Sequence, residues 1–136
     1  CLRIDVIEQT LRDAGVAPGA SGYGVANALA LSNLQLGRTV VADCVNPVQE
    51  SRAAWRVTAA TAGVALVDIQ LVCSNTREHQ RRVDSREGDI PGLIPPSWQS
   101  VSTHEYEPWD EVPLTLDTAR ISATQAVEAL LTHLRH

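Results

Sequence analysis

Two long apolar runs constrain the fold of this chain more than any other feature. Residues 39–43 (Thr-Val-Val-Ala-Asp) and residues 64–73 are largely apolar and lack strict alternation with polar residues. A strand that is buried on both faces has this pattern, and such strands are typical of parallel sheets covered by helices. The segments around them repeat apolar residues at helical spacing, so strands and helices alternate along the chain. The sequence therefore predicts an α/β fold with a mainly parallel sheet.

The boundaries of the predicted elements come from capping and breaking residues. Gly37 and Gly63 are natural helix stops, and Ser74 or Asn75 can cap the helix that follows them. Glycine and proline concentrate in two stretches, which we expect to be irregular. We expect strands at 1–5, 39–43, 64–73 and 114–117, helices at 6–14, 25–36, 48–62, 76–86 and 122–135, and irregular segments at 15–24 and 88–113.

Composition limits the organisation and the partners of the chain. Its 136 residues, 44% of them hydrophobic, suffice for a single domain with its own core. The net charge is −5 and the arginine-rich segment 77–86 is interleaved with acids, so we expect no nucleic-acid partner. No run reaches transmembrane length and no signal peptide is recognisable, so we expect no membrane partner. Three widely spaced cysteines without a C-x-x-C motif fit a reducing, cytoplasmic location. Homo-oligomerisation stays open.

Acidic residues at the ends of predicted strands are the strongest functional signal. In open α/β sheets, ligands bind beyond the carboxyl ends of the strands. Asp5, Asp43 and Asp117 all stand at such ends. Asp43 follows its apolar strand in the manner of a Walker-B acid, which holds Mg²⁺ directly or through water. The competing interpretation is that these acids only cap the next element.

Asp5 follows Arg3 across one residue, so both would lie on one face of a strand. A carboxylate at this place can accept the proton of a substrate hydroxyl, which is the general-base role in phosphoryl transfer. Alternatively, Asp5 only caps the helix after it.

Arginines in the predicted helix 76–86 provide a second signal. Arg82 and Arg86 are four residues apart, so their guanidinium groups would lie on one helix face and could clamp phosphoryl oxygens. Alternatively, the helix is solvated and these arginines pair with neighbouring acids. Trp98, in the proline-rich stretch, either packs that stretch against the rest of the protein or lines a substrate pocket.

Together these motifs resemble small P-loop kinases of the AAA-family ATPase or predicted-kinase group. These are relatives of gluconate kinase, adenylyl-sulfate kinase and chloramphenicol phosphotransferase. The resemblance covers essentially the whole chain and implies a three-layer P-loop NTPase kinase-like fold. The motifs that carry it are residues 2–8 (Leu-Arg-Ile-Asp-Val-Ile-Glu), 38–47, 72–86, 89–92 (Asp-Ile-Pro-Gly), 105–110 (Glu-Tyr-Glu-Pro-Trp-Asp) and 116–118.

The resemblance implies roles for particular residues. Asp5 would contact the acceptor hydroxyl and Asp43 would lie near Mg²⁺. A lid helix at about 76–87 would carry Arg82 and Arg86 over the phosphates of ATP. The acceptor, a small molecule, would bind in a pocket shaped by residues of about 88–111. The other assigned residues are Thr118 and Ala119 near the adenine, and Arg3, Asn46 and Trp98 in substrate binding.

One departure from the family is decisive. All 11 basic residues are arginine, so the phosphate loop G-x-x-x-x-G-K-[ST] and its lysine are absent from these residues. In the family, the first strand and this loop precede the element at residues 2–5, and that strand lies between those matching 39–43 and 64–73. We therefore expect these two strands to pair directly, to be bridged by another chain, or to belong to a longer protein.

The sequence thus predicts an ATP-dependent phosphotransferase that acts on a small-molecule hydroxyl acceptor, or the major part of one. The alternative is a non-catalytic nucleotide-binding or interaction domain on the same fold.

Overall fold

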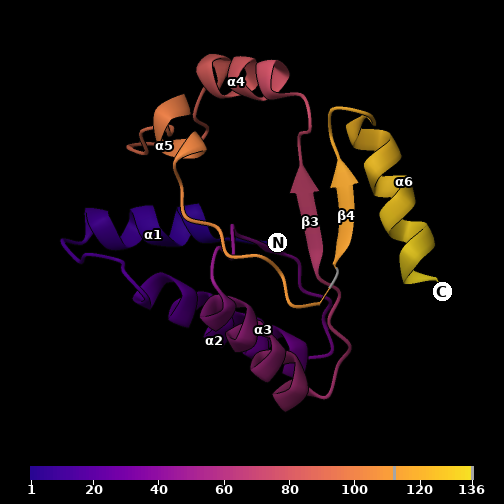
Figure 1. Cartoon of the computed structure of the whole chain (residues 1–136). Helices are drawn as coiled ribbons and strands as arrows, with labels where there is room; N and C mark the ends of the chain where they lie inside the picture. Colours follow the sequence, from indigo (N-terminus) through magenta and orange to yellow (C-terminus); the bar gives the residue numbers. More distant parts are fainter. Residues whose placement is uncertain (112, 136) are drawn as a thin grey trace. The chain divides into compact units, whose positions relative to one another are not determined.

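The computed structural model describes residues 1–111 and 113–135, which form two compact units. Each unit contains one pair of short parallel strands, and one or two helices lie between successive strands along the chain. One of the strand pairs and the helices are labelled in Figure 1. This mixture of helices and parallel strands agrees with an α/β chain. Unit 1 consists of Cys1–Leu66, Gly88–Ile94 and Glu105–Glu107, and unit 2 of Val67–Glu87, Pro95–His104 and Pro108–His136.

Unit 1 contains the strand pair β1–β2. β1 (Leu2–Arg3) runs parallel to β2 (Ala42–Asp43), with Arg3 opposite Asp43. The helices of this unit are α1 (Ile4–Asp13), α2 (Ser21–Gln35) and α3 (Gln49–Ala62). α2 packs against α1, α3 and β1.

Small side chains make this packing close. Ala26 and Ala30 of α2 are buried with Ile4 and Trp55 in one cluster. Alanine leaves room for the two neighbouring helices, and Trp55 provides most of the remaining volume. Gly63 ends α3 with a left-handed backbone (φ 70°), as the sequence predicted.

Unit 2 contains the strand pair β3–β4. β3 (Ile69–Val72) runs parallel to β4 (Leu114–Asp117), with Val72 opposite Asp117. The helices are α4 (Thr76–Ser85), α5 (Trp98–Ser102), which contacts α4, and α6 (Ala123–Leu134). Asn75 caps α4, and Ser122 with Gln125 forms a capping box at the start of α6.

Several elements differ from the prediction. The predicted strand 1–5 ends at Arg3, and Asp5 lies in the first turn of α1. The predicted strands 39–43 and 64–73 shorten to Ala42–Asp43 and Ile69–Val72, because a strand extends only where a neighbour completes its hydrogen bonds. α2 begins at Ser21 and α5 forms at Trp98, both within stretches predicted to be irregular.

The strand order can be compared with the three outcomes expected for the predicted strands 39–43 and 64–73. In the described part of the chain, β2 pairs with β1 and β3 pairs with β4, and β2 and β3 do not pair with each other. The two strands lie in different units, so the three expected outcomes stay predictions.

Among residues 1–111 and 113–135, none of the helices combines the length and the apolarity needed to cross a membrane.

Candidate functional site

In unit 1, a charged group forms at the carboxyl ends of β1 and β2. The Arg3 guanidinium donates two hydrogen bonds to the Asp89 carboxylate, at 2.9 and 3.0 Å, and its Nε lies 3.9 Å from Oδ2 of Asp43. The pairing with Asp89, with smaller effects of Asp43 and Asp5, raises the pKa of Arg3. The same bidentate pairing lowers the pKa of Asp89. The predicted residues Arg3, Asp5 and Asp43 therefore lie close enough to share one electrostatic environment.

Asp5 occupies the first turn of α1 with an exposed side chain. A carboxylate there interacts favourably with the positive end of the helix dipole. It also leaves the carboxylate open to solvent beside the strand ends. The structure thus accommodates both interpretations of Asp5, as a helix-stabilising acid and as an acid that can meet a ligand.

The turn after β2 depends on Asn46, whose backbone is left-handed (φ 48°). Its Oδ1 accepts hydrogen bonds from Nε1 of Trp55 at 2.9 Å and from the Cys44 thiol at 3.2 Å. Its backbone N–H donates to the Tyr23 hydroxyl at 3.2 Å. Burial raises the pKa values of the Cys44 thiol and the Tyr23 hydroxyl, so both groups stay neutral at pH 7. These bonds give Asn46 a structural role, and its predicted contact with substrate stays a prediction.

Arg52 hydrogen-bonds to the same turn. The sequence did not predict this role. The Arg52 side chain is only 1% exposed, although it is charged. Its Nε donates to the backbone oxygen of Asn46 at 2.9 Å, and its Nη2 to that of Glu107 at 2.6 Å. The guanidinium also lies over the Tyr106 ring, 5.1 Å from its centroid. Helical spacing gave a usable signal, because Arg52 shares a face of α3 with the apolar Trp55 and Ala59.

In unit 2, two predicted residues are direct partners. The Arg82 guanidinium donates to Oγ1 of Thr118 at 3.0 Å and to its backbone oxygen at 3.1 Å. Its Nε also donates to Glu78 at 3.0 Å. The Thr118 hydroxyl donates to the Val72 carbonyl at 3.0 Å, which ties the end of β4 to the end of β3.

Asp117 organises the turn beside this pair. Its Oδ1 accepts hydrogen bonds from the backbone N–H groups of Ser74, at 3.1 Å, and Ala119, at 3.0 Å. These hydrogen bonds, those from Ser74 first, lower the pKa of Asp117. Ala119 therefore follows Thr118 in a turn that is fixed by a charged side chain. The predicted nucleotide-binding pair, Thr118 and Ala119, lies in a turn whose backbone is hydrogen-bonded to the side chains of Arg82 and Asp117.

Two predictions on the lid region need correction or a different interpretation. Arg86 follows α4 with an extended backbone (φ −65°, ψ 127°), because the helix ends at Ser85. The prediction that Arg82 and Arg86 share one continuous helix face is therefore wrong. Trp98 is half-buried and makes an edge-to-face contact with His79 at 5.0 Å, which favours the packing interpretation.

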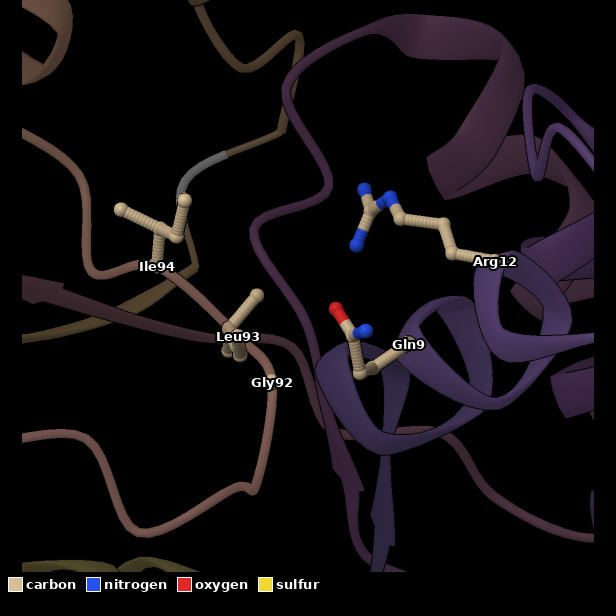
Figure 2. Close-up of a pocket in the computed structure, with 5 residues that line it drawn as sticks. All are labelled: Gln9, Arg12, Gly92, Leu93 and Ile94. Atoms are coloured by element: carbon tan, nitrogen blue, oxygen red, sulfur yellow. The ribbon is translucent and has the colours of Figure 1, made fainter.

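A pocket of about 290 Å³ lies in unit 1 (Figure 2). Gln9 and Arg12 of α1 line one side, and the loop residues Gly92, Leu93 and Ile94 line the other. The loop belongs to the segment 88–111 that was predicted to shape an acceptor pocket. Gln9 and Arg12 were not predicted, since a polar stripe on a short helix is usually a solvated face.

Metal binding by the protein alone finds little support. The described side chains include no group of three or more His, Cys, Asp or Glu residues arranged around a common point for a metal ion. Asp43 alone can offer one exposed carboxylate. Mg²⁺ in nucleotide sites is typically held by one or two carboxylates together with phosphates and water, so Asp43 fits that pattern.

Comparison of the chain with protein-family models, with curated proteins and with solved structures finds no match. Any function has therefore to be derived from the residues of the chain itself. The features available for this are the charged group at β1–β2, the Arg82–Thr118 pair at β3–β4, and the pocket beside α1.

Proposed function

We propose that the chain is the major part of an ATP-dependent phosphotransferase that acts on a hydroxyl group of a small molecule. The main support is the ion pair of Arg3 with Asp43 at the carboxyl ends of a parallel strand pair, with the exposed Asp5 two residues after Arg3. In open α/β folds this edge is where ligands bind. It therefore combines a cation, a free carboxylate and a candidate metal ligand at the expected edge.

The proposal gives each of these residues a distinct task. Asp5 accepts the proton of the acceptor hydroxyl, which needs an exposed carboxylate near the bound hydroxyl. Asp43 provides a carboxylate for Mg²⁺. The positive charge of Arg3 offsets the negative charge of the carboxylates around it. The bidentate pairing with Asp89 holds the guanidinium through Nη1 and Nη2 and leaves its Nε 3.9 Å from Oδ2 of Asp43.

ATP, when bound, supplies the phosphoryl group and Mg²⁺ neutralises its charge. By the resemblance, Thr118 and Ala119 would approach the adenine, and Asp117 accepts a hydrogen bond from the backbone N–H of Ala119 in their turn. The phosphate loop belongs, in this proposal, to a segment outside these 136 residues, since none of them is a lysine.

The test measures ADP release in the presence of Mg²⁺ and a panel of hydroxyl compounds. Two proteins are compared. One is the 136-residue chain alone, and the other, the joined form, also contains the native segment that the resemblance places before Cys1. We expect turnover only in the joined form. The substitution Asp5→Asn should lower kcat about 100-fold or more, the usual contribution of a general base. Asp84→Asn, at an exposed acid on α4, is the matched control and should leave kcat unchanged.

Nucleotide binding without turnover in the joined form would overturn the proposal and favour a non-catalytic nucleotide-binding domain. Turnover that survives Asp5→Asn unchanged would remove Asp5 from the mechanism.

A further inference from the structure

The pocket beside α1 has a donor and an acceptor on the same wall. Figure 2 shows Gln9 and Arg12 extending from α1 toward the loop that carries Gly92, Leu93 and Ile94. Nε2 of Gln9 donates to Oδ1 of Asp13 at 2.9 Å, which fixes the orientation of the amide. Figure 2 shows the amide oxygen of Gln9 pointing toward the guanidinium of Arg12, while Nε2 of Gln9 faces Gly92 of the loop.

Gly92 allows the loop to lie close to α1. Gly92 has a left-handed backbone (φ 83°), and a Cβ atom at this position would lie 3.2 Å from Nε2 of Gln9. Both observations favour glycine, because other residues rarely adopt this backbone and a side chain would push the loop away. Glycine at this position therefore lets the loop lie close to the side chain of Gln9.

Charge around the pocket argues against an anionic ligand. Arg12 already pairs with Glu8 at 3.3 Å, and Asp13 lies beside Gln9. An anion would meet these two carboxylates and the amide oxygen of Gln9, with a single cation that is already partnered. A hydroxyl group both donates and accepts, so it matches the amide oxygen and the guanidinium together. Leu93 and Ile94 offer apolar surface to a carbon skeleton.

The position of the pocket connects it to Asp5. Asp5, Gln9 and Arg12 are spaced by four and three residues along α1, so they lie on one stripe of the helix. One helical turn, about 5–6 Å, separates Asp5 from Gln9 along the axis. The pocket thus lies about one helical turn along α1 from the carboxylate proposed as the general base.

We propose that this pocket is the acceptor subsite and that its ligand is a small, uncharged molecule with adjacent hydroxyl groups. This assignment rests on the proposed phosphotransferase function. A volume of about 290 Å³ is just below the range of about 300–1,000 Å³ for small-molecule sites, which limits the ligand to about monosaccharide size.

The test is a titration of the ¹⁵N-labelled 136-residue chain, without nucleotide, monitored by NMR. The two probes are methyl β-D-glucopyranoside and methyl β-D-glucopyranosiduronate, which share a ring and differ by one carboxylate. We expect the neutral glucoside to bind at least 5-fold more tightly than the uronate. The amide signals of Gln9, Arg12, Gly92 and Leu93 should shift.

Arg12→Gln should weaken binding of the glucoside at least 5-fold, and folding should be retained because this side chain is 45% exposed. Arg38→Gln, at an exposed arginine elsewhere in unit 1, is the matched control and should not affect binding. Tighter binding of the uronate, or no shift at the pocket residues with either probe, would overturn the proposal. Because nucleotide is absent, these outcomes are independent of ADP release, which judges the phosphotransferase function separately.

Discussion

Nη2 of Arg52 donates a 2.6 Å hydrogen bond to the backbone oxygen of Glu107, a residue 55 positions later in the sequence. The same side chain holds the Asn46 carbonyl, so one buried cation connects the turn after β2 to the segment Glu105–Glu107. The backbone N–H of Glu107 also donates to the Pro47 carbonyl at 2.7 Å. Arg52 therefore supports the backbone that follows Asp43.

Replacing Arg52 should destabilise unit 1 strongly. Arg52→Ala removes several hydrogen bonds to backbone oxygens. These oxygens stay buried without their donors, and the lost side chain leaves a cavity. We expect the free energy of unfolding to fall by about 2–4 kcal/mol. Urea unfolding followed by tryptophan fluorescence measures this change. Arg38→Ala, at an exposed site, is the control and should change stability by less than about 0.5 kcal/mol. A similar small effect of both substitutions would contradict the buried role of Arg52.

Because the backbone of Asn46 is left-handed, two substitutions at this position can separate the effect of backbone strain from the effect of lost hydrogen bonds. Asn46→Ala loses the bonds to Trp55 and Cys44 and also places an alanine at φ 48°. Asn46→Gly loses the same bonds without backbone strain. We expect the alanine variant to be less stable than the glycine variant by about 1 kcal/mol. Thermal unfolding of the two variants measures the difference. Equal stability would show that the turn relaxes to another backbone conformation.

The parts of the fold that the sequence predicted are those with local signals. β4 matches the predicted strand 114–117, and α3 and α6 match within one residue at either end. Gly63, Asn75 and Ser122 mark helix ends through their own backbone or side-chain chemistry. These features depend on neighbours within four residues, so they can be predicted without the tertiary structure.

The remaining features depend on contacts between distant residues. The pairing of Arg3 with Asp89 joins residues 86 positions apart, and that of Arg82 with Thr118 joins residues 36 positions apart. Neither is encoded in local spacing. Asp5 was placed at a strand end, yet α1 begins at Ile4, because the β1–β2 ladder ends at Arg3 and Asp43. The candidate site was therefore predicted in its residue types and only partly in its contacts.

Glu78 makes the stability of α4 depend on pH. Hydrogen bonds from Arg81 and Arg82 lower the pKa of Glu78 from 4.5 to about 2. A carboxyl group whose pKa is lower in the folded state binds protons less readily there than in the unfolded chain. Its contribution is therefore complete above pH 4.5 and is lost as the pH falls from 4.5 toward 2.

NMR titration of the Glu78 side-chain carboxyl measures this pKa directly. Glu78→Gln should flatten the pH dependence of thermal stability between pH 4.5 and 2, while Glu87→Gln, at an exposed acid after α4, should leave it unchanged. A Glu78 pKa at its ordinary value would show that the two arginines do not hold this carboxylate in solution.

The Arg82–Thr118 pair gives the sharpest test of unit 2. In the proposed kinase, Arg82 lies over the phosphates of ATP. In this structure its guanidinium instead donates hydrogen bonds to Thr118 and Glu78. A double-mutant cycle with Arg82→Ala and Thr118→Val isolates the energy of this pair. We expect a coupling of about 1 kcal/mol, less than the roughly 1.5–3 kcal/mol of hydrogen bonds to charged groups, because the Arg82 side chain is partly exposed to solvent. Arg81→Ala with Thr118→Val is the matched cycle and should show none, because Arg81 pairs with Glu78. Coupling that vanishes on addition of ATP would mean that the guanidinium leaves Thr118 for the nucleotide. A coupling near zero in the free chain would contradict the pairing itself.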